Sequence, residues 1–413
     1  MVESDTRLNY LLRNRDFLFF IIGRFCNVVG VQILTVAVGW HVYQLTGDPL
    51  DLGYIGLAQF LPALFLFLIA GYVSDKYDRR IILFFCNLAH FVVVVMLMLA
   101  LWGEYSDVRM IFGILVLHGA ARAFFHTAGQ AILPNIVPAE AFPKAVAYSS
   151  SVNKAAQLIG PALGGGLIAW AEDWTYYVTL SMFALSAISS IIISARLKLE
   201  APDKMTFSTL LGGFNFIWKN KIVLGAISID LMAVLLGGVM GLLPIYASDI
   251  LKVGADGLGI MRAMPGVGSL IMGLWLTQIA SPRLIGPSLF ISLFIFGLSI
   301  IVFSLSEVFW LSLIALTIYG ASDMVSVYIR LTLVQLATPD QMRGRVSAVN
   351  SVSINASNEL GDFRAGLCAA GLGTIPAVLL GGIATLGITA IWFRCFPTIR
   401  GIDGFEDVEK RLK

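Results

Sequence analysis

Ten ionisable side chains interrupt otherwise apolar stretches of this 413-residue chain, and they have the clearest capacity for chemistry. A charge at the centre of a bilayer costs about 2.5–3.5 kcal/mol on insertion scales, so such groups pair with one another or line a water-filled path. Three of the six cations lie in the first half of the chain, whereas all four carboxylates lie in the second half. The ten residues are Arg24, Arg122, Lys154, Asp230, Arg262, Asp323, Arg330, Glu359, Asp362 and Arg364.

Glu359 and Asp362 form the densest part of this set. Their spacing of three residues places both carboxylates on one face of a helix. Two neighbouring carboxylates can share a proton near neutral pH, so one interpretation is a proton-coupling site. The alternative is a structural salt-bridge network in which either carboxylate pairs with Arg330 or Lys154.

Arg24 and Asp230 suggest a second site. Each lies about eight residues inside its apolar stretch, roughly 12 Å deep at 1.5 Å per residue. One hypothesis is a latch between the two halves of the chain that opens when Asp230 is protonated. The alternative is two independent packing charges. Arg122 and Asp323 align by an internal repeat described below, and either a proton-coupling role or a structural role fits them.

Several aromatic and polar residues in apolar stretches could line a cavity for a large amphipathic ligand. Each of them could equally face lipid or pack in the protein interior. The candidates are Trp40, His41, Tyr148, Asn153, Gln157 and Tyr319.

Enzyme motifs are missing from the sequence. The four histidines form no HExxH pattern, and neither a GxSxG nucleophile turn nor a phosphate-binding GxxxxGK[ST] loop occurs. The four cysteines lie in or beside apolar stretches without CxxC spacing, which predicts neither disulfides nor a metal site. The sequence therefore predicts a protein that is not an enzyme or an ATP-driven pump and that needs no cofactor.

The elements that carry these residues follow from composition. The chain is 58% hydrophobic and 13% charged, against roughly 45–50% and about 25% in soluble domains. A membrane-spanning helix needs about 20 apolar residues. Twelve such stretches predict an all-α integral membrane protein: 16–44, 51–73, 80–102, 107–132, 143–170, 174–195, 222–249, 256–279, 285–304, 308–335, 344–368 and 371–395.

The positive residues are distributed unevenly around these stretches. With both termini in the cytoplasm, most of the 28 Lys and Arg residues fall on the inner side, and only Arg109 and Lys252 fall outside. Positive residues favour the cytoplasmic side, so an even number of crossings is predicted. The net charge of +2 is too small to indicate nucleic-acid binding.

An internal repeat divides the chain. A shift of 201 residues aligns Gly119 with Gly320 and Gly160 with Gly361, which indicates duplication. Six spans separate the copies, so two six-helix bundles of the same orientation are predicted. The predicted parts are the N-terminal bundle (1–196), a cytoplasmic linker with an amphipathic helix (197–221), the C-terminal bundle (222–396) and a cytoplasmic tail (397–413).

The loop after the second stretch reads Gly71-Tyr-Val-Ser-Asp-Lys-Tyr-Asp-Arg-Arg80. It resembles the signature loop of the major facilitator superfamily, G-x-x-x-D-[RK]-x-G-[RK]-[RK], with Asp78 where glycine is commonest. The resemblance implies the fold of that superfamily, twelve helices in two parallel-repeat bundles. It also implies that the loop acts as a conformational clamp, formed by Gly71, Asp75, Lys76, Arg79 and Arg80.

The fifth stretch contains Gly160-Pro161-Ala-Leu-Gly164-Gly165. This segment resembles the end of a motif found in exporters, although Ala147 and Ala156 replace its two earlier glycines. Across nearly the whole chain, the layout resembles the bacterial drug and siderophore exporter branch that includes the enterobactin exporter family.

The resemblance implies a secondary active transporter of the inner membrane that exports a siderophore or amphipathic drug by alternating access. The expected partners are a small-molecule substrate, protons and the lipid bilayer, and the expected state is a monomer. Alternatives are an importer or a lysophospholipid transporter of the same fold and, from another class, a membrane receptor or an intramembrane enzyme.

Overall fold

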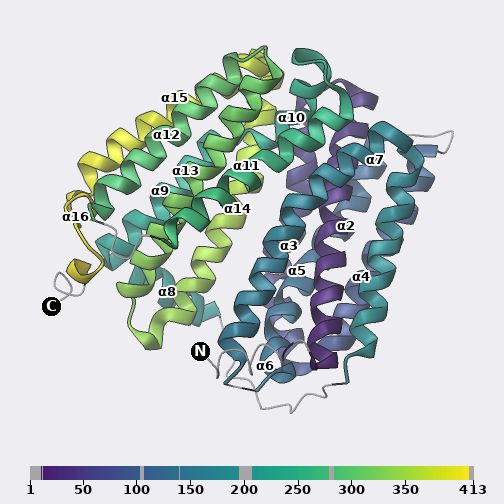
Figure 1. The fold of residues 1–413 in the computed structure, drawn as a ribbon, viewed down its shortest axis with the longest axis horizontal. Helices are drawn as coiled ribbons and strands as arrows, with labels where there is room; N and C mark the ends of the chain where they lie inside the picture. The colour runs from purple at the N-terminus through teal and green to yellow at the C-terminus, as the bar shows by residue number, and fades with distance from the viewer. Residues whose placement is uncertain are drawn as a thin grey trace. The chain divides into compact units, whose positions relative to one another are not determined.

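The computed structural model describes residues 11, 13–102, 107–138, 140–194, 207–278 and 283–408. Within these ranges every regular element is a helix, which confirms the predicted all-α class (Figure 1). The helices are α2 (Arg15–Thr46), α3 (Pro49–Lys76), α4 (Arg79–Trp102), α5 (Val108–Ala131), α6 (Leu133–Ile136), α7 (Phe142–Ile192), α8 (Phe207–Lys219), α9 (Lys221–Gly237), η1 (Met240–Leu242), α10 (Leu243–Ile245), η2 (Tyr246–Ile250), α11 (Gly254–Leu276), α12 (Ile285–Leu305), α13 (Phe309–Leu336), α14 (Asp340–Leu372), α15 (Thr374–Cys395) and α16 (Pro397–Arg400).

Ten described helical segments are long and apolar enough to cross a membrane. One of them, α7, has 51 residues and contains a non-helical residue, Ala171, at φ −158° and ψ 82°. At about 1.5 Å per residue it is more than twice as long as the hydrocarbon core is thick, so it spans two of the predicted stretches. Another predicted stretch falls on α14, which is long enough but rich in polar residues. All twelve predicted stretches thus fall on helices, while the count of twelve crossings stays a prediction.

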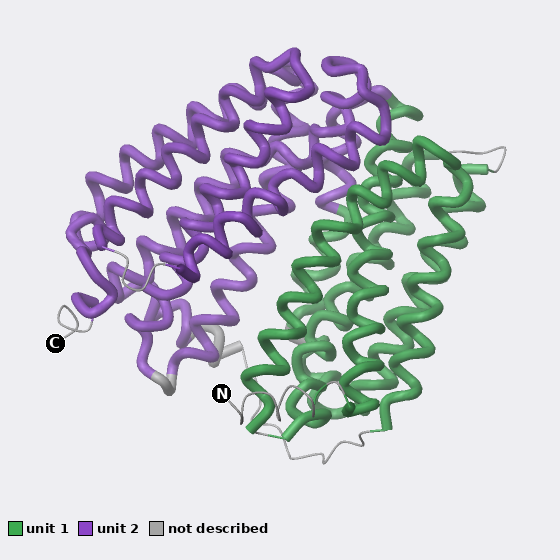
Figure 2. Tube along the Cα trace, in the orientation of Figure 1, with its two compact units in different colours: residues 1–46, 58–205 green, residues 47–57, 206–413 purple. Residues whose placement is uncertain are grey.

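The chain forms two compact units, which Figure 2 colours separately. Unit 1 comprises residues 1–46 and 58–205, and unit 2 comprises residues 47–57 and 206–413. The beginning of α3 therefore groups with the second unit rather than the first. The reason is local packing, because a Cβ on Gly53 would lie 3.2 Å from the Cα of Phe363 in α14. Residues 197–206 of the predicted linker lie outside the described ranges, and its predicted amphipathic helix corresponds to α8.

In unit 1, α2 packs along α7, and α4 packs between α5 and α7. Polar groups inside this packing bond to one another. The Ser186 hydroxyl donates to the Gly23 carbonyl at 2.7 Å, and the Asn27 side-chain amide donates to Asn87 at 2.9 Å. Such internal bonds satisfy the buried polar groups.

In unit 2, α13 packs against α11 and α12, while α9 packs against α14 and α15. Its apolar core includes Ile227, Leu289, Leu333 and Ile399, all at most 7% exposed. Gly373 connects α14 to α15 at φ +90°, a conformation that glycine adopts without a steric penalty. Unit 2 therefore brings α9 and α14 into direct contact, and that contact positions the charges described next.

Candidate functional site

The seventh predicted span is broken inside unit 2. Helix α9 ends at Gly237, and Gly238 has an extended ψ of 123° before η1 begins at Met240. The consecutive glycines explain the position of the break, because they destabilise a helix interior. Discontinuous helices of this kind leave backbone groups exposed at membrane depth, and in transporters they commonly mark binding or coupling sites.

Charged side chains satisfy the backbone on both sides of this break. On the α9 side, the Arg364 Nε donates to the Leu235 carbonyl at 3.0 Å. On the other side, the Gly241 N–H donates to the Asp362 carboxylate at 3.0 Å. A cation therefore meets the carbonyl end of one helical segment and a carboxylate meets the amide end of the next, as the helix dipoles favour.

Close backbone packing fixes Asp362 at this position. A Cβ on Gly361 would lie 2.9 Å from the Val234 carbonyl oxygen, and one on Gly241 would lie 3.0 Å from the Cβ of Asp362. The first distance is too short for a Cβ against a backbone oxygen, and the second would force Asp362 to shift. The glycines beside Asp362 therefore bring α14 against the broken helix, and we call Gly238, Gly241, Arg262, Asp362 and Arg364 the helix-break cluster.

The helix-break cluster holds more donors than it uses internally. Arg262 donates to the Met240 carbonyl at 3.4 Å, and its charge, like that of Arg364, acts on Asp362. Among the described residues, the Nε of Arg262 and the Nη2 of Arg364 are buried without a hydrogen-bond partner. Glu359, one turn before Asp362, also acts on it electrostatically. Protonation of Asp362 would thus alter the charge balance of the entire break.

Asp230 and Arg330 form a second buried pair in unit 2. The carboxylate of Asp230 lies 2.5 Å from the guanidinium of Arg330, and both side chains are less than 10% exposed. Ser326, four residues earlier in α13, accepts from the Nε of Arg330 at 2.9 Å. In the alternative of a structural salt-bridge network, Glu359 or Asp362 would pair with Arg330 or Lys154, and Arg330 pairs with Asp230 instead. The latch between Asp230 and Arg24 stays a prediction.

Tyr319 lies near three of the carboxylates. Its hydroxyl interacts electrostatically with Asp323, Asp362 and Asp230. Its ring stacks on Phe296 at a centroid distance of 4.3 Å. Tyr319 was a candidate for the substrate cavity, and that role stays a prediction.

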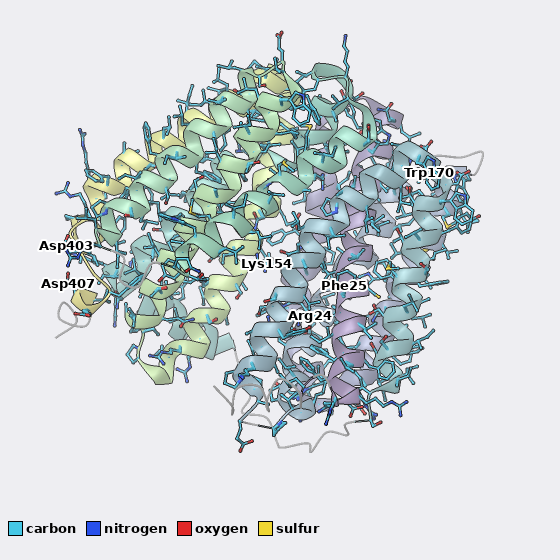
Figure 3. All side chains as sticks on the ribbon, viewed as in Figure 1. Arg24, Phe25, Lys154, Trp170, Asp403 and Asp407 are labelled. Carbon is cyan, nitrogen blue, oxygen red and sulfur yellow. The ribbon has the colours of Figure 1, made fainter. Side chains whose placement is uncertain are left out.

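Unit 1 carries three of the six cations of the set, and none of its carboxylates. Arg24 on α2 lies over the ring of Phe20, with 5.9 Å from the guanidinium carbon to the ring centroid. Arg24 and Arg122 both act on His126, so these three basic groups lie near one another. Lys154 is exposed on α7 (Figure 3). The three cations of the set in this unit therefore lie on α2, α5 and α7.

The histidines show what sequence spacing could not predict. His41, expected at a substrate cavity, lies 2.6 Å from the Glu172 carboxylate and 2.8 Å from the Tyr176 hydroxyl. His90 and His118 lie on neighbouring helices with their Nδ1 atoms 3.0 Å apart, and both are buried. In the described part of the chain, no three His, Cys, Asp or Glu side chains converge as metal ligands would.

The signature loop joins several helix ends of unit 1. Arg79 donates to the Ala131 carbonyl at the end of α5 at 2.8 Å, and Arg80 donates to the Ile193 carbonyl after α7 at 2.7 Å. Asp78, which replaces the usual glycine, accepts from the backbone and side chain of Arg80 and so begins α4.

The remaining clamp residues make weaker contacts. Asp75 lies 3.9 Å from Arg79, Lys76 donates to the Tyr72 hydroxyl at 3.4 Å, and a Cβ on Gly71 would have no neighbour within 4 Å. Arginines at helix carbonyl ends are electrostatically favourable. The loop therefore ties together the ends of α4, α5 and α7.

The motif of the fifth stretch mediates packing between α7 and α2. A Cβ on Gly160 would lie 2.5 Å from the Cβ of Gln32, and one on Gly164 would lie 3.1 Å from the Cα of Ile33. Pro161 and Gly165 are buried in the same helix. The other cavity candidates in unit 1 are half-buried or exposed on α2 and α7: Trp40, Tyr148, Asn153 and Gln157.

These helices and their intramembrane charges define a multi-pass membrane protein of the transporter class. The sequence model of the Major Facilitator Superfamily matches residues 20–361. The chain therefore belongs to the major facilitator superfamily, and it is a membrane transporter.

Two kinds of relatives extend this result. The enterobactin exporter EntS of Citrobacter koseri is 24% identical over 389 residues, covering 92% of this chain and 88% of the relative. The multidrug efflux pump Tap of Mycobacterium tuberculosis is 28% identical over 401 residues, covering 91% of each. A solved structure of the nucleoside transporter NupG covers 94% of this chain and 99% of its own at a TM-score of 0.69. At 13% identity that likeness shows the fold alone.

Proposed function

We propose that this chain is a proton-coupled exporter of a bulky organic molecule, either a siderophore or an amphipathic drug, in the inner membrane with both termini cytoplasmic. The exporter relatives, which match about nine-tenths of the chain, support export. The proton coupling is supported by a single observation, the hydrogen bond between the Asp362 carboxylate and the Gly241 N–H at the broken span.

The proposed coupling step acts on the break itself. An ionised Asp362 stabilises the amide end of the segment that begins at Met240, and it balances the charges of Arg262 and Arg364. Protonation removes this charge and weakens the bond to Gly241. The second part of the seventh span can then change its angle relative to α9, and this movement couples proton uptake to the exchange between inward-open and outward-open states.

Other charges have supporting roles in this proposal. Glu359 and Tyr319 would pass protons to and from Asp362, and Asp323 would serve the same route. Asp230 with Arg330 would hold α9 against α13 while the segment after the break moves. Arg24 and Arg122 would provide positive charge for an anionic part of the substrate or for the proton route. The signature loop would act as a conformational clamp, because it holds the ends of α4, α5 and α7 together.

The test measures substrate and proton movement together in everted membrane vesicles. Respiration acidifies the vesicle interior and quenches the dye ACMA, and ethidium or enterobactin is then added. Proton-coupled export predicts that the added probe partly restores the fluorescence, because protons leave the vesicle as the probe enters. When a protonophore has already collapsed the gradient, the probe should cause no further change. We expect Asp362→Asn to reduce this recovery at least tenfold, whereas Glu307→Gln, which neutralises an exposed carboxylate, should leave it unchanged.

Equal recovery in Asp362→Asn and the unmodified protein would contradict the coupling role of Asp362. Export of either probe without any proton movement would leave the transport class standing but remove proton coupling. Accumulation of the probes inside intact cells, driven by an inward proton gradient, would favour the import alternative.

A further inference from the structure

Helix α8 in unit 2 has one face in the protein and one face outside it. Ile217 belongs to the apolar core at 4% exposure, and Gly213 packs so closely on α14 that a Cβ would lie 3.0 Å from the Arg345 carbonyl oxygen. On the other side, Phe214 and Trp218 are 54% and 66% exposed. Neighbouring exposed aromatic side chains form an apolar patch that can serve as an interaction site.

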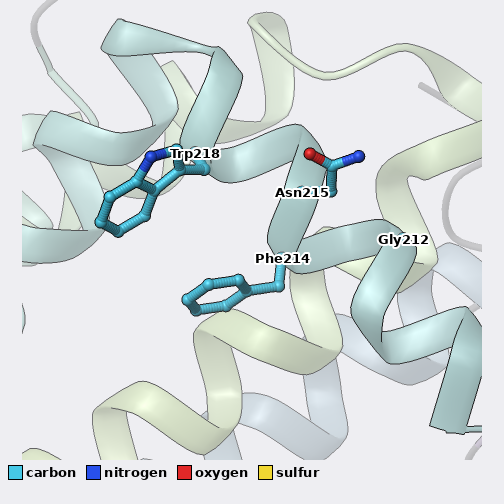
Figure 4. A pocket seen from close by; sticks show the side chains of 4 residues that line it. All are labelled: Gly212, Phe214, Asn215 and Trp218. Carbon is cyan, nitrogen blue, oxygen red and sulfur yellow. The ribbon is translucent and has the colours of Figure 1, made fainter.

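The two aromatic rings form one continuous apolar surface. They stack at a centroid distance of 6.1 Å and an interplanar angle of 25°, and they extend from the same side of α8 (Figure 4). With Gly212 and Asn215 they line an open groove of about 640 Å³. The surface is therefore preformed and large enough for part of a lipid molecule.

A cation lies at the edge of this groove. The Nη1 of Arg345 is 3.5 Å from the position that a Cβ would take on Gly212, which is a lining residue. Arg345 is exposed, and its side chain donates only a long contact of 3.8 Å to the Met342 sulfur. Among the described residues it forms no ion pair. Its guanidinium can therefore bind an anion from outside the protein, and a phosphate matches its bidentate geometry.

The position of α8 along the chain places the groove at a membrane surface. The helix ends at Lys219, and the apolar segment that can cross the membrane begins at Lys221. Asn220 fixes this corner, because its side chain accepts from the amides that begin α9 and donates to the Ala337 carbonyl after α13 at 3.2 Å. Lys219 and Lys221 are both exposed, so further positive charge follows Trp218 directly along the chain.

We propose that the α8 groove binds an anionic phospholipid of the adjacent leaflet. The phosphate is held by Arg345 with Lys219 beside it, and the glycerol and upper acyl chain lie on Phe214 and Trp218. Aromatic residues favour the level of the lipid headgroups, and clustered cations beside a membrane helix select anionic lipids. The proposal requires only that the chain is a membrane protein, so it is independent of proton-coupled export.

The test uses the full-length protein in lipid nanodiscs. Phosphatidylcholine nanodiscs carry 10 mol% of brominated phosphatidylglycerol or, separately, 10 mol% of brominated phosphatidylcholine, and bromine quenches nearby tryptophan. We expect brominated phosphatidylglycerol to quench the tryptophan fluorescence at least twofold more than brominated phosphatidylcholine does. Trp218→Phe should remove most of this difference, which identifies the tryptophan concerned.

Two matched variants test the charge. Arg345→Gln should reduce the ratio of phosphatidylglycerol to phosphatidylcholine quenching to near one, whereas Arg283→Gln, an exposed arginine outside the groove, should preserve it. Thermal unfolding of each variant confirms that it is folded. Equal quenching by both lipids in the unmodified protein would overturn the proposal, and so would a preference that survives in both Arg345→Gln and Trp218→Phe.

Discussion

The two units use equivalent glycines for the same helix contacts. In unit 1, Gly119 on α5 meets the backbone of Gln59 on α3. In unit 2, Gly320 on α13 meets the backbone of Pro265 on α11. Likewise, Gly160 on α7 packs against α2, and its repeat partner Gly361 on α14 packs against α9. Positions where two backbones touch tolerate only the smallest residue, so the repeat is clearest at these contacts.

The units differ where unit 2 carries its carboxylates. Helix α2 runs without interruption over Arg15–Thr46, whereas its counterpart α9 breaks after Gly237. Gly160 is followed by Pro161, but the equivalent glycine on α14 is followed by Asp362, the acceptor at the break. The packing framework is therefore shared by the two units, while the carboxylates and the broken helix occur together in unit 2. The following experiments test both halves of that statement.

The largest expected effect concerns the Asp230–Arg330 pair of unit 2. Asp230→Asn leaves a buried guanidinium without its counter-charge, which typically costs about 3–5 kcal/mol. We expect a marked fall in the unfolding temperature of the detergent-solubilised protein. Intrinsic fluorescence measured during heating reports this temperature. The double variant Asp230→Leu with Arg330→Met removes both charges and should recover most of the loss. A single variant as stable as the unmodified protein would show that the pair does not hold α9 against α13.

The second effect tests whether the shared glycine contacts are equivalent. Gly119→Ala and Gly320→Ala each force a methyl group into a neighbouring backbone, and overpacking of this kind costs about 1–3 kcal/mol. Both should lower the unfolding temperature by several degrees and by similar amounts. Gly113→Ala, on α5 but with no atom within 4 Å of its Cβ position, serves as the control. If only one of the two variants had a lower unfolding temperature, the two glycine contacts would not be equivalent.

Helical spans and the repeat could be predicted from the sequence because hydrophobicity and glycine spacing are local signals. The merging of two predicted stretches in α7 and the break after α9 were not predicted. Gly237-Gly238 was the available signal for that break. A glycine pair alone does not distinguish a break from close helix packing, however, and only the contact of α14 with this segment decides between them.

Side-chain partners could be predicted less well, for a physical reason. Helical periodicity assigns a residue to a face, but it does not say which neighbouring helix lies opposite. Arg330 could have met any of four carboxylates, and it pairs with the one on α9. The partners His41 and Glu172 are 131 residues apart and carry no shared motif. The helix that carries each of these groups was thus predictable, whereas their pairing required the packed units.

The smallest expected effect concerns the contact of His41 with Glu172 in unit 1. The glutamate side chain is 60% exposed, and exposed pairs contribute about 0.2–1 kcal/mol because water screens them. We expect Glu172→Gln to lower the unfolding temperature by no more than about 2 °C. His41→Ala should cost more, because it also removes the ring that stacks on Tyr176 at 5.6 Å and hydrogen-bonds with its hydroxyl group. If Glu172→Gln were as damaging as Asp230→Asn, the contrast between a screened pair in unit 1 and a buried pair in unit 2 would fail.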